Sequence, residues 1–156
     1  MSRLVSKITI FNTLALFVQA QTPVKPEPEV TCPVTISVST TGIITSPGFK
    51  FEDDFATLSN TTNCTWSLTA PENKIIEIHT KFIEIEGAMP ECYFDYLQFR
   101  DSDSTKISQK ICGKNSIPVF QSGTNKLEIE FKTDYSNNVN GFQLGYKLLD
   151  KAIPKK

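Results

Sequence analysis

The sequence is poor in the residues on which most catalytic and metal-binding sites depend. It contains one histidine, His79, and four cysteines that form no Cys-x-x-Cys motif. A zinc site usually needs clustered cysteine and histidine ligands, and a hydrolytic triad needs a histidine held beside a nucleophile and an acid. No nucleophile-elbow motif is present either. We therefore expect a protein that is not an enzyme and read His79 as an ordinary surface residue.

The chain also lacks an excess of positive charge. Its 16 lysine and arginine residues are balanced by 17 aspartate and glutamate residues, for a net charge of −1. Proteins that bind nucleic acid generally carry a basic face that neutralises phosphates. The composition thus argues against nucleic acid as a partner.

Long apolar runs are absent except near the amino terminus. Arg3 and Lys7 precede a mostly apolar stretch, 8–18, which is too short to span a bilayer, and Ala20 ends a small-residue cleavage pattern. We predict that residues 1–20 are a signal peptide and that the protein is secreted and extracellular, with no membrane span. Cleavage would remove two positive charges and leave 14 basic against 17 acidic residues.

The remaining residues, about 136, suit one domain. Residues 21–31 contain three prolines and alternating charges, which is typical of an extended linker. Residues 150–156 form a short basic tail. The folded domain is predicted over residues 32–149.

The four cysteines are Cys32, Cys64, Cys92 and Cys112. An even number in an exported chain indicates disulfide bonds, and three pairings are possible. We favour Cys32–Cys64 and Cys92–Cys112, because sequential pairing suits neighbouring antiparallel strands. Each bond would stabilise the fold by about 3 kcal/mol through loop closure.

Hydrophobic residues recur with a period of two, and no run of ten or more residues has a helical stripe. Such alternation predicts half-buried β-strands. One strand changes phase between Thr80 and Ile83, which indicates a bulge. Many short strands separated by turn residues predict an all-β sandwich. The inward positions are expected at Ile76 and Ile78; at Tyr93, Asp95, Leu97 and Phe99; at Leu127, Ile129 and Phe131; and at Phe142, Leu144, Tyr146 and Leu148.

The order and spacing of several landmarks resemble a CUB domain from Cys32 to about Leu148. This resemblance implies a jelly-roll-like sandwich of two antiparallel sheets and the same sequential disulfides. The landmarks are Cys32, Gly42-Ile43-Ile44-Thr45-Ser46-Pro47, Cys64-Thr65-Trp66, Ile83-Glu84-Ile85-Glu86, Cys92-Tyr93-Phe94-Asp95-Tyr96-Leu97, Cys112-Gly113, Phe131-Lys132-Thr133-Asp134 and Gly141-Phe142.

Three acids, Glu86, Asp95 and Asp134, lie at the ends of predicted strands. Carboxylates that converge there could hold a hard cation such as Ca²⁺, although strand-end acids also commonly face water or accept backbone hydrogen bonds. The resemblance implies the first alternative, because many CUB domains bind one Ca²⁺ with acids at these positions. It also implies further oxygen ligands from the following loop, here Ser136 and Asn137.

One departure from the family pattern affects this site. Five residues separate Glu86 from Cys92, one more than expected, and they include Gly87 and Pro90. Two alternatives follow: a complete site with three carboxylates, or one from which Glu86 has been displaced.

Two adjacent glycosylation sequons, Asn60-Thr61-Thr62 and Asn63-Cys64-Thr65, lie at the second cysteine, and the second of them contains it. We expect one of the two asparagines to be modified in a eukaryotic secretory pathway. Asn60 is the preferred acceptor, since Asn63 adjoins a strand that carries a disulfide.

Together these features predict a secreted, non-enzymatic interaction module that binds an extracellular protein or glycan through calcium-ordered loops. Single CUB modules of this size resemble spermadhesins and the CUB proteins of venoms and other secretions. Two other functions are possible. The protein could regulate or inhibit an extracellular protease, since the chain ends at Lys156 without room for a catalytic domain, or it could be a metal-independent carbohydrate-binding domain.

Overall fold

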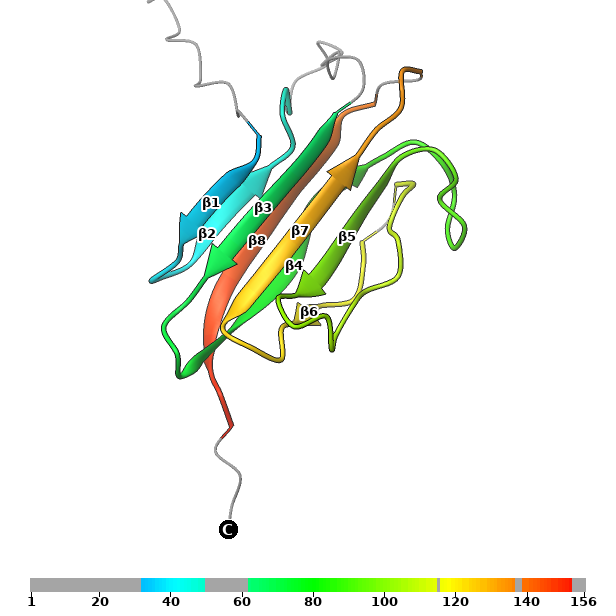
Figure 1. Ribbon diagram of the computed structural model, residues 1–156. Coiled ribbons are helices and arrows are strands. Elements are labelled where there is room, and N and C mark those ends of the chain that lie inside the picture. Colours follow the sequence, from blue (N-terminus) through cyan, green and yellow to red (C-terminus); the bar gives the residue numbers. More distant parts are fainter. Residues whose placement is uncertain (1–31, 50–61, 115, 137–138, 153–156) are drawn as a thin grey trace, which may run out of the picture.

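The computed structural model describes residues 32–49, 62–114, 116–136 and 139–152, and within them it is a sandwich of two four-stranded sheets (Figure 1). The first sheet has the order β1 (Val34–Ser37), β3 (Asn63–Thr69), β7 (Lys126–Lys132), β5 (Tyr96–Asp101). The second has the order β2 (Gly42–Thr45), β8 (Gly141–Asp150), β4 (Lys74–Glu84), β6 (Phe120–Gln121). No helix within these ranges is long and apolar enough to cross a membrane.

Two-residue periodicity places the core between the sheets, as predicted. Ile129 and Phe131 of β7 and Phe142 and Leu144 of β8 are each 0% exposed. Phe142 also meets two rings of the facing sheet edge to face, with centroids 5.5 Å from Trp66 and 5.1 Å from Phe131. Such aromatic pairs add to the free energy gained from burial alone. The two sheets therefore share one continuous core.

The predicted bulge is also confirmed. β4 pairs with β8 along its length, and the register shifts between Thr80 and Phe82. The extra residue restores the inward orientation of Ile83, which is 6% exposed. β4 can thus continue to the end of the sandwich where Glu86 follows it.

The structure contains the disulfides Cys32–Cys64 and Cys92–Cys112. They correspond to the favoured pairing, but the strand argument for the first bond was wrong. β1, which follows Cys32, runs parallel to β3, which contains Cys64. All other strand pairs between described residues are antiparallel.

One predicted strand is shorter than expected. β5 begins at Tyr96, so Tyr93 belongs to the preceding loop and is 83% exposed rather than buried. The alternation of hydrophobic residues was misleading here, because Cys92 has a positive φ of 44° that turns the chain before the strand begins.

Replacing Phe142 with alanine should lower the free energy of unfolding by about 3–5 kcal/mol, because it removes the ring that both sheets contact. Denaturant unfolding measures this loss. Ile43→Ala on β2 is the control, since Ile43 is 61% exposed and its truncation should change stability by less than about 0.5 kcal/mol. Similar losses for both variants would contradict the described core.

Candidate functional site

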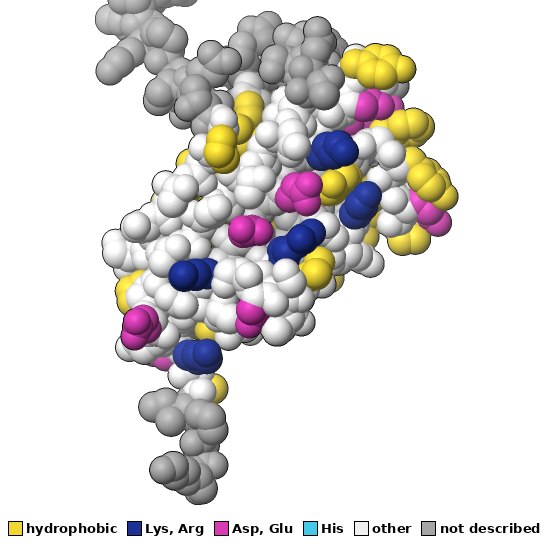
Figure 2. All heavy atoms as spheres, viewed as in Figure 1, with side chains coloured by type: hydrophobic (Ala, Val, Ile, Leu, Met, Phe, Trp, Pro, Cys, Tyr) yellow, Lys and Arg dark blue, Asp and Glu magenta, His cyan; other side chains and the backbone are white. Residues whose placement is uncertain are grey.

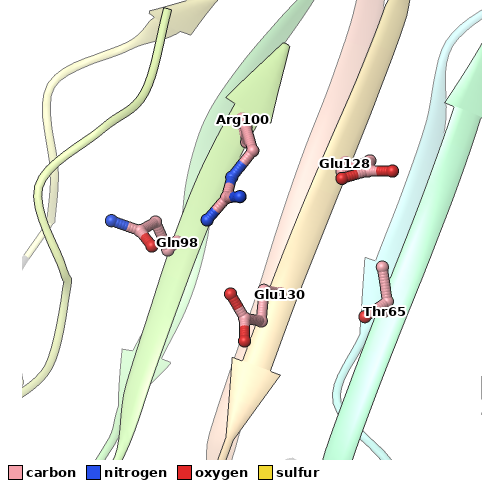
Figure 3. A pocket seen from close by; sticks show the side chains of 5 residues that line it. All are labelled: Thr65, Gln98, Arg100, Glu128 and Glu130. Carbon is pink, nitrogen blue, oxygen red and sulfur yellow. The ribbon is translucent and has the colours of Figure 1, made fainter. Parts of the chain in front are cut away.

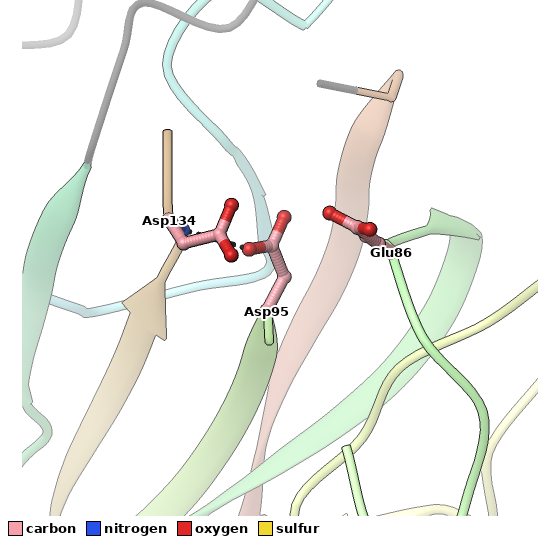
Figure 4. Close-up of side chains that lie close together, drawn as sticks. All are labelled: Glu86, Asp95 and Asp134. Atoms are coloured by element: carbon pink, nitrogen blue, oxygen red, sulfur yellow. Dashed lines mark hydrogen bonds between the residues drawn. The ribbon is translucent and has the colours of Figure 1, made fainter. Parts of the chain in front are cut away.

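One end of the sandwich brings together three acidic side chains from both sheets. Glu86 follows the end of β4 in the second sheet, Asp95 immediately precedes β5, and Asp134 follows β7 in the first sheet. Because β5 and β7 are antiparallel neighbours, with Tyr96 opposite Lys132, the residues flanking that pair come close together. Figure 4 shows the three carboxylates directed toward a common space.

The three carboxylates converge closely enough to share an ion. One oxygen from each lies within 4.8 Å of an oxygen from each of the others. The longer segment that precedes Cys92 has therefore not moved Glu86 away from the other two acids.

The loop between Glu86 and Asp95 is fixed by covalent and backbone contacts. Ile85 and Gly113 exchange backbone hydrogen bonds of 3.1 and 2.7 Å, which extends the strand just before Glu86. Cys112 then bonds to Cys92 within the loop. Gly87 adopts a φ of 107° and lies against the disulfide, where an added Cβ would be 3.3 Å from the Cys112 sulfur. The extra residue is thus absorbed by a glycine turn.

Asp95 occupies the centre of the cluster and is 0% exposed. Its Oδ1 accepts a 2.8 Å hydrogen bond from the backbone amide of Asp134. Its Oδ2 is buried and has no hydrogen-bond donor among the described residues. A buried oxygen without a donor is costly unless a cation or a proton satisfies it.

The charge of Asp95 is correspondingly disfavoured. Burial raises the pKa of Asp95 to about 6, the Asp134 amide hydrogen bond opposes that rise, and the negative charges of Asp134 and Glu86 contribute to it. The ordinary value is 3.8. At neutral pH the metal-free site holds several negative charges that repel one another.

The loop after Asp134 supports that residue. Ser136 donates two hydrogen bonds to Asp134 Oδ1, from its amide at 2.7 Å and from its hydroxyl at 2.9 Å. These bonds orient the carboxylate and keep the Ser136 oxygen beside the cluster. Asn137, the other predicted ligand, lies outside the described residues.

Exposed aromatic side chains flank the acids, and sequence reasoning missed them. Tyr93 and Phe94 precede Asp95 and are 83% and 54% exposed, while Tyr135 follows Asp134 and is 81% exposed. Figure 2 shows hydrophobic side chains gathered at this rim of the molecule, near the β4–β5 connection. We call Tyr93, Phe94 and Tyr135 the aromatic rim. The sequence did hold a clue to these aromatic residues, because each of them is within two positions of a predicted calcium-binding acid.

Of the two sequon asparagines, Asn60 lies outside the described residues. Asn63 is the first residue of β3 and is exposed, with a side chain on the outer face of the first sheet, whereas its neighbour Cys64 is 0% exposed. The disulfide therefore does not shield Asn63, which removes the reason for preferring Asn60.

Comparison with known proteins agrees with this architecture. The family model for the CUB domain matches residues 32–146. The chain belongs to the CUB family. This CUB domain is 35% identical over 97 residues to the cubilin homolog of Drosophila melanogaster and 32% identical over 129 residues to human neuropilin-2. These matches cover 57% and 80% of the chain but only 2% and 13% of the respective relatives.

Solved structures show the same fold. The crystal structure of the MASP-1 CUB2 domain bound to Ca²⁺ aligns with a TM-score of 0.62 and 20% identity, over 75% of this chain and 99% of that domain. At that identity the likeness concerns the sandwich itself.

Replacing Asp95 with asparagine should stabilise the metal-free protein at neutral pH. The folded pKa of Asp95 is raised, so its contribution to stability is present below about pH 4 and is lost as the pH rises through about 6. Asparagine keeps an acceptor for the Asp134 amide but carries no charge. We expect D95N to gain up to about 3 kcal/mol at pH 7.5 but only about 1 kcal/mol at pH 4.5.

Unfolding of metal-free wild type and D95N at the two pH values measures this difference. Glu91→Gln is the control, because Glu91 is exposed on the same loop and lies outside the cluster. A D95N variant that is less stable than wild type at pH 7.5 would contradict the repulsion described here.

Proposed function

We propose that this protein is a secreted, non-enzymatic CUB interaction module that binds Ca²⁺ through Glu86, Asp95 and Asp134. The observation that carries the proposal is the convergence of three carboxylates around Asp95, whose Oδ2 is buried without a donor from the described residues. A hard cation would satisfy that oxygen and offset the repulsion among the acids. The site thus fits a Ca²⁺ ion, which prefers oxygen ligands.

The ligand set that we propose extends into the loop after Asp134. Ser136 contributes its hydroxyl beside Asp134, and Asn137 is retained as a further candidate from the sequence. Extracellular Ca²⁺ sites commonly have dissociation constants of about 10⁻⁴–10⁻³ M. The ion would therefore be bound in extracellular fluid and released at cytosolic calcium levels. The MASP-1 CUB2 domain, which has the same fold and binds Ca²⁺, supports this assignment by analogy.

The partner that we propose docks on the loops at this end of the sandwich. With one Ca²⁺ bound, three carboxylates leave a net charge of about −1, which attracts a basic side chain. The aromatic rim stands beside the acids, and aromatic faces bind cations with about 0.5–2 kcal/mol. A protein segment that presents a lysine or arginine together with apolar groups would complement both features. A glycan that carries an amine is the alternative partner.

Secretion is supported by the predicted signal peptide, which lies outside the described residues, and by two disulfide bonds, which persist in oxidising compartments. The non-enzymatic role stays a prediction from the sequence, in which His79 is the only histidine. His79 lies on the outer face of β4 against Gly145, where an added Cβ would be 2.2 Å from the imidazole Nε2.

Calcium should raise the melting temperature of the wild type and not that of Asp134→Asn. A ligand that binds only the native state, at a hundredfold excess over its dissociation constant, adds about 2.7 kcal/mol to stability. Asparagine retains an acceptor for Ser136 but removes one charge from the cluster. Thermal melts in millimolar calcium and in a chelator measure the effect.

Glu84→Gln is the matched control for this experiment. Glu84 lies at the same end of β4 but forms a 2.6 Å ion pair with Lys114 and does not belong to the cluster. It should keep the full calcium response. A D134N variant with an undiminished response would overturn the site assignment.

A lysine analogue such as N-acetyl-lysine methyl ester should perturb the NMR signals of Tyr93, Asp95, Asp134 and Tyr135 when calcium is present. The reason is that the ion orders the acids that attract the ammonium group. Signals of β6 serve as the internal reference, because β6 pairs with Glu77 and Ile78 of β4, well before the end of that strand that Glu86 follows. Equal shifts with and without calcium, or shifts confined to another face, would contradict the proposed docking surface.

To identify the natural partner, wild type and D134N can be used as paired baits in the source fluid. A protein retained in calcium by the wild type alone would identify a calcium-dependent partner. A protease captured stoichiometrically would instead support the regulatory role.

A further inference from the structure

The outer face of the first sheet carries polar side chains arranged in rows across three strands. β3, β7 and β5 pair so that Asn63 lies opposite Lys132, which in turn lies opposite Tyr96. The next two rows of outward-facing residues are Thr65–Glu130–Gln98 and Ser67–Glu128–Arg100. Figure 2 shows side chains of both charges alternating over this face.

Two of these rows form a shallow hollow, lined by Thr65, Gln98, Arg100, Glu128 and Glu130 (Figure 3). We call it the polar hollow. Every lining side chain ends in a hydrogen-bonding group, and none is apolar. One guanidinium and two carboxylates give a local charge of −1, too small to select strongly for an anion or a cation.

The polar hollow offers donors and acceptors beyond those that the protein uses, which include Glu130 Oε1 as the acceptor of a 3.1 Å hydrogen bond from the Tyr96 hydroxyl. Within the described part of the chain, the Arg100 side chain forms no ion pair, and Figure 3 shows its guanidinium directed toward Gln98 and Glu130. The side-chain amide of Gln98 donates a 2.9 Å hydrogen bond from its nitrogen to the backbone carbonyl of Ser108, so its side-chain oxygen remains available as an acceptor. A sugar suits such a surface, because each hydroxyl both donates and accepts hydrogen bonds.

The sequon asparagine Asn63 lies directly beside this hollow. Asn63 and Thr65 are on the same face of β3, and two residues along a strand span about 6.8 Å. The first sugars of a chain attached to Asn63 would therefore reach Thr65, Glu130 and Gln98 without any change in the sheet.

We propose that Asn63 carries an N-linked glycan and that the core sugars of that glycan lie in the polar hollow, hydrogen-bonded to Arg100 and its neighbours. The glycan would extend along β3 away from the acidic cluster, because Asn63 is at the cluster end of that strand and Thr69 is at the other. It covers the sheet face and leaves the calcium-binding end open for a partner. This inference depends on the proposed secretion but not on calcium binding.

The experiment uses the full chain secreted from a eukaryotic cell line that makes only oligomannose glycans. Mass spectrometry of the peptide that contains residue 63 reports whether the site is occupied. An endoglycosidase then trims the glycan to a single sugar, and the melting temperature is compared before and after trimming. We expect occupancy at Asn63 and a fall of a few degrees on trimming, which is the scale of one or two lost hydrogen bonds in a domain of this size.

Arg100→Ala tests whether the glycan stabilises the protein through hydrogen bonds in the polar hollow or only through excluded volume. In this variant trimming should lower the melting temperature by much less than in the wild type. Lys81→Ala is the control, since Lys81 is exposed on the second sheet and should leave the trimming effect unchanged.

Two outcomes would overturn the proposal. They are an unmodified Asn63 in the secreted protein and an equal effect of trimming in R100A and K81A. A protein that never reaches the medium would refute the proposed secretion. Calcium binding could still be tested separately, by thermal melts of refolded protein.

Discussion

The repulsion among three carboxylates at one end of the sandwich is the constraint on which the functional surface depends. Asp95 is fully buried, and Glu86 and Asp134 approach it from opposite sheets. Such an arrangement persists only if the surrounding framework holds the acids in place. The framework consists of the shared core around Phe142, the strand pairing of β5 with β7, and the Cys92–Cys112 disulfide. The acids of the cluster therefore repel one another, while strand pairing and the disulfide hold the backbone around them.

The sequence alone predicted much of this framework. Two-residue alternation identified the buried faces of β7 and β8, and the phase change near Thr80 identified the bulge. These predictions succeeded because each rests on local backbone geometry, which does not depend on distant residues. The convergence of Glu86 with Asp95 could not be predicted in the same way. It required knowing that Gly87 turns the longer loop back against the Cys112 sulfur.

Other features of the surface were beyond sequence reasoning for a related reason. Tyr93 continues the alternating pattern of β5 and was therefore expected to be buried. That prediction was wrong, because the positive φ of Cys92 turns the chain before the strand begins. The polar hollow has residues from three strands that are far apart in the chain, and only the register of Thr65, Glu130 and Gln98 brings them together. The parallel pairing of β1 with β3 likewise has no local signal.

The acidic end of the sandwich and the outer face of the first sheet differ in their chemistry, and we propose a different role for each. The acidic end carries the aromatic rim and is where we propose that Ca²⁺ binds, whereas the first sheet presents a polar face beside Asn63. The most direct test of the central claim is terbium luminescence, because Tb³⁺ replaces Ca²⁺ and is excited by nearby tyrosines such as Tyr135. We predict sensitised emission that saturates at about one ion per chain and is displaced by millimolar calcium. No emission, or emission that calcium does not displace, would contradict it.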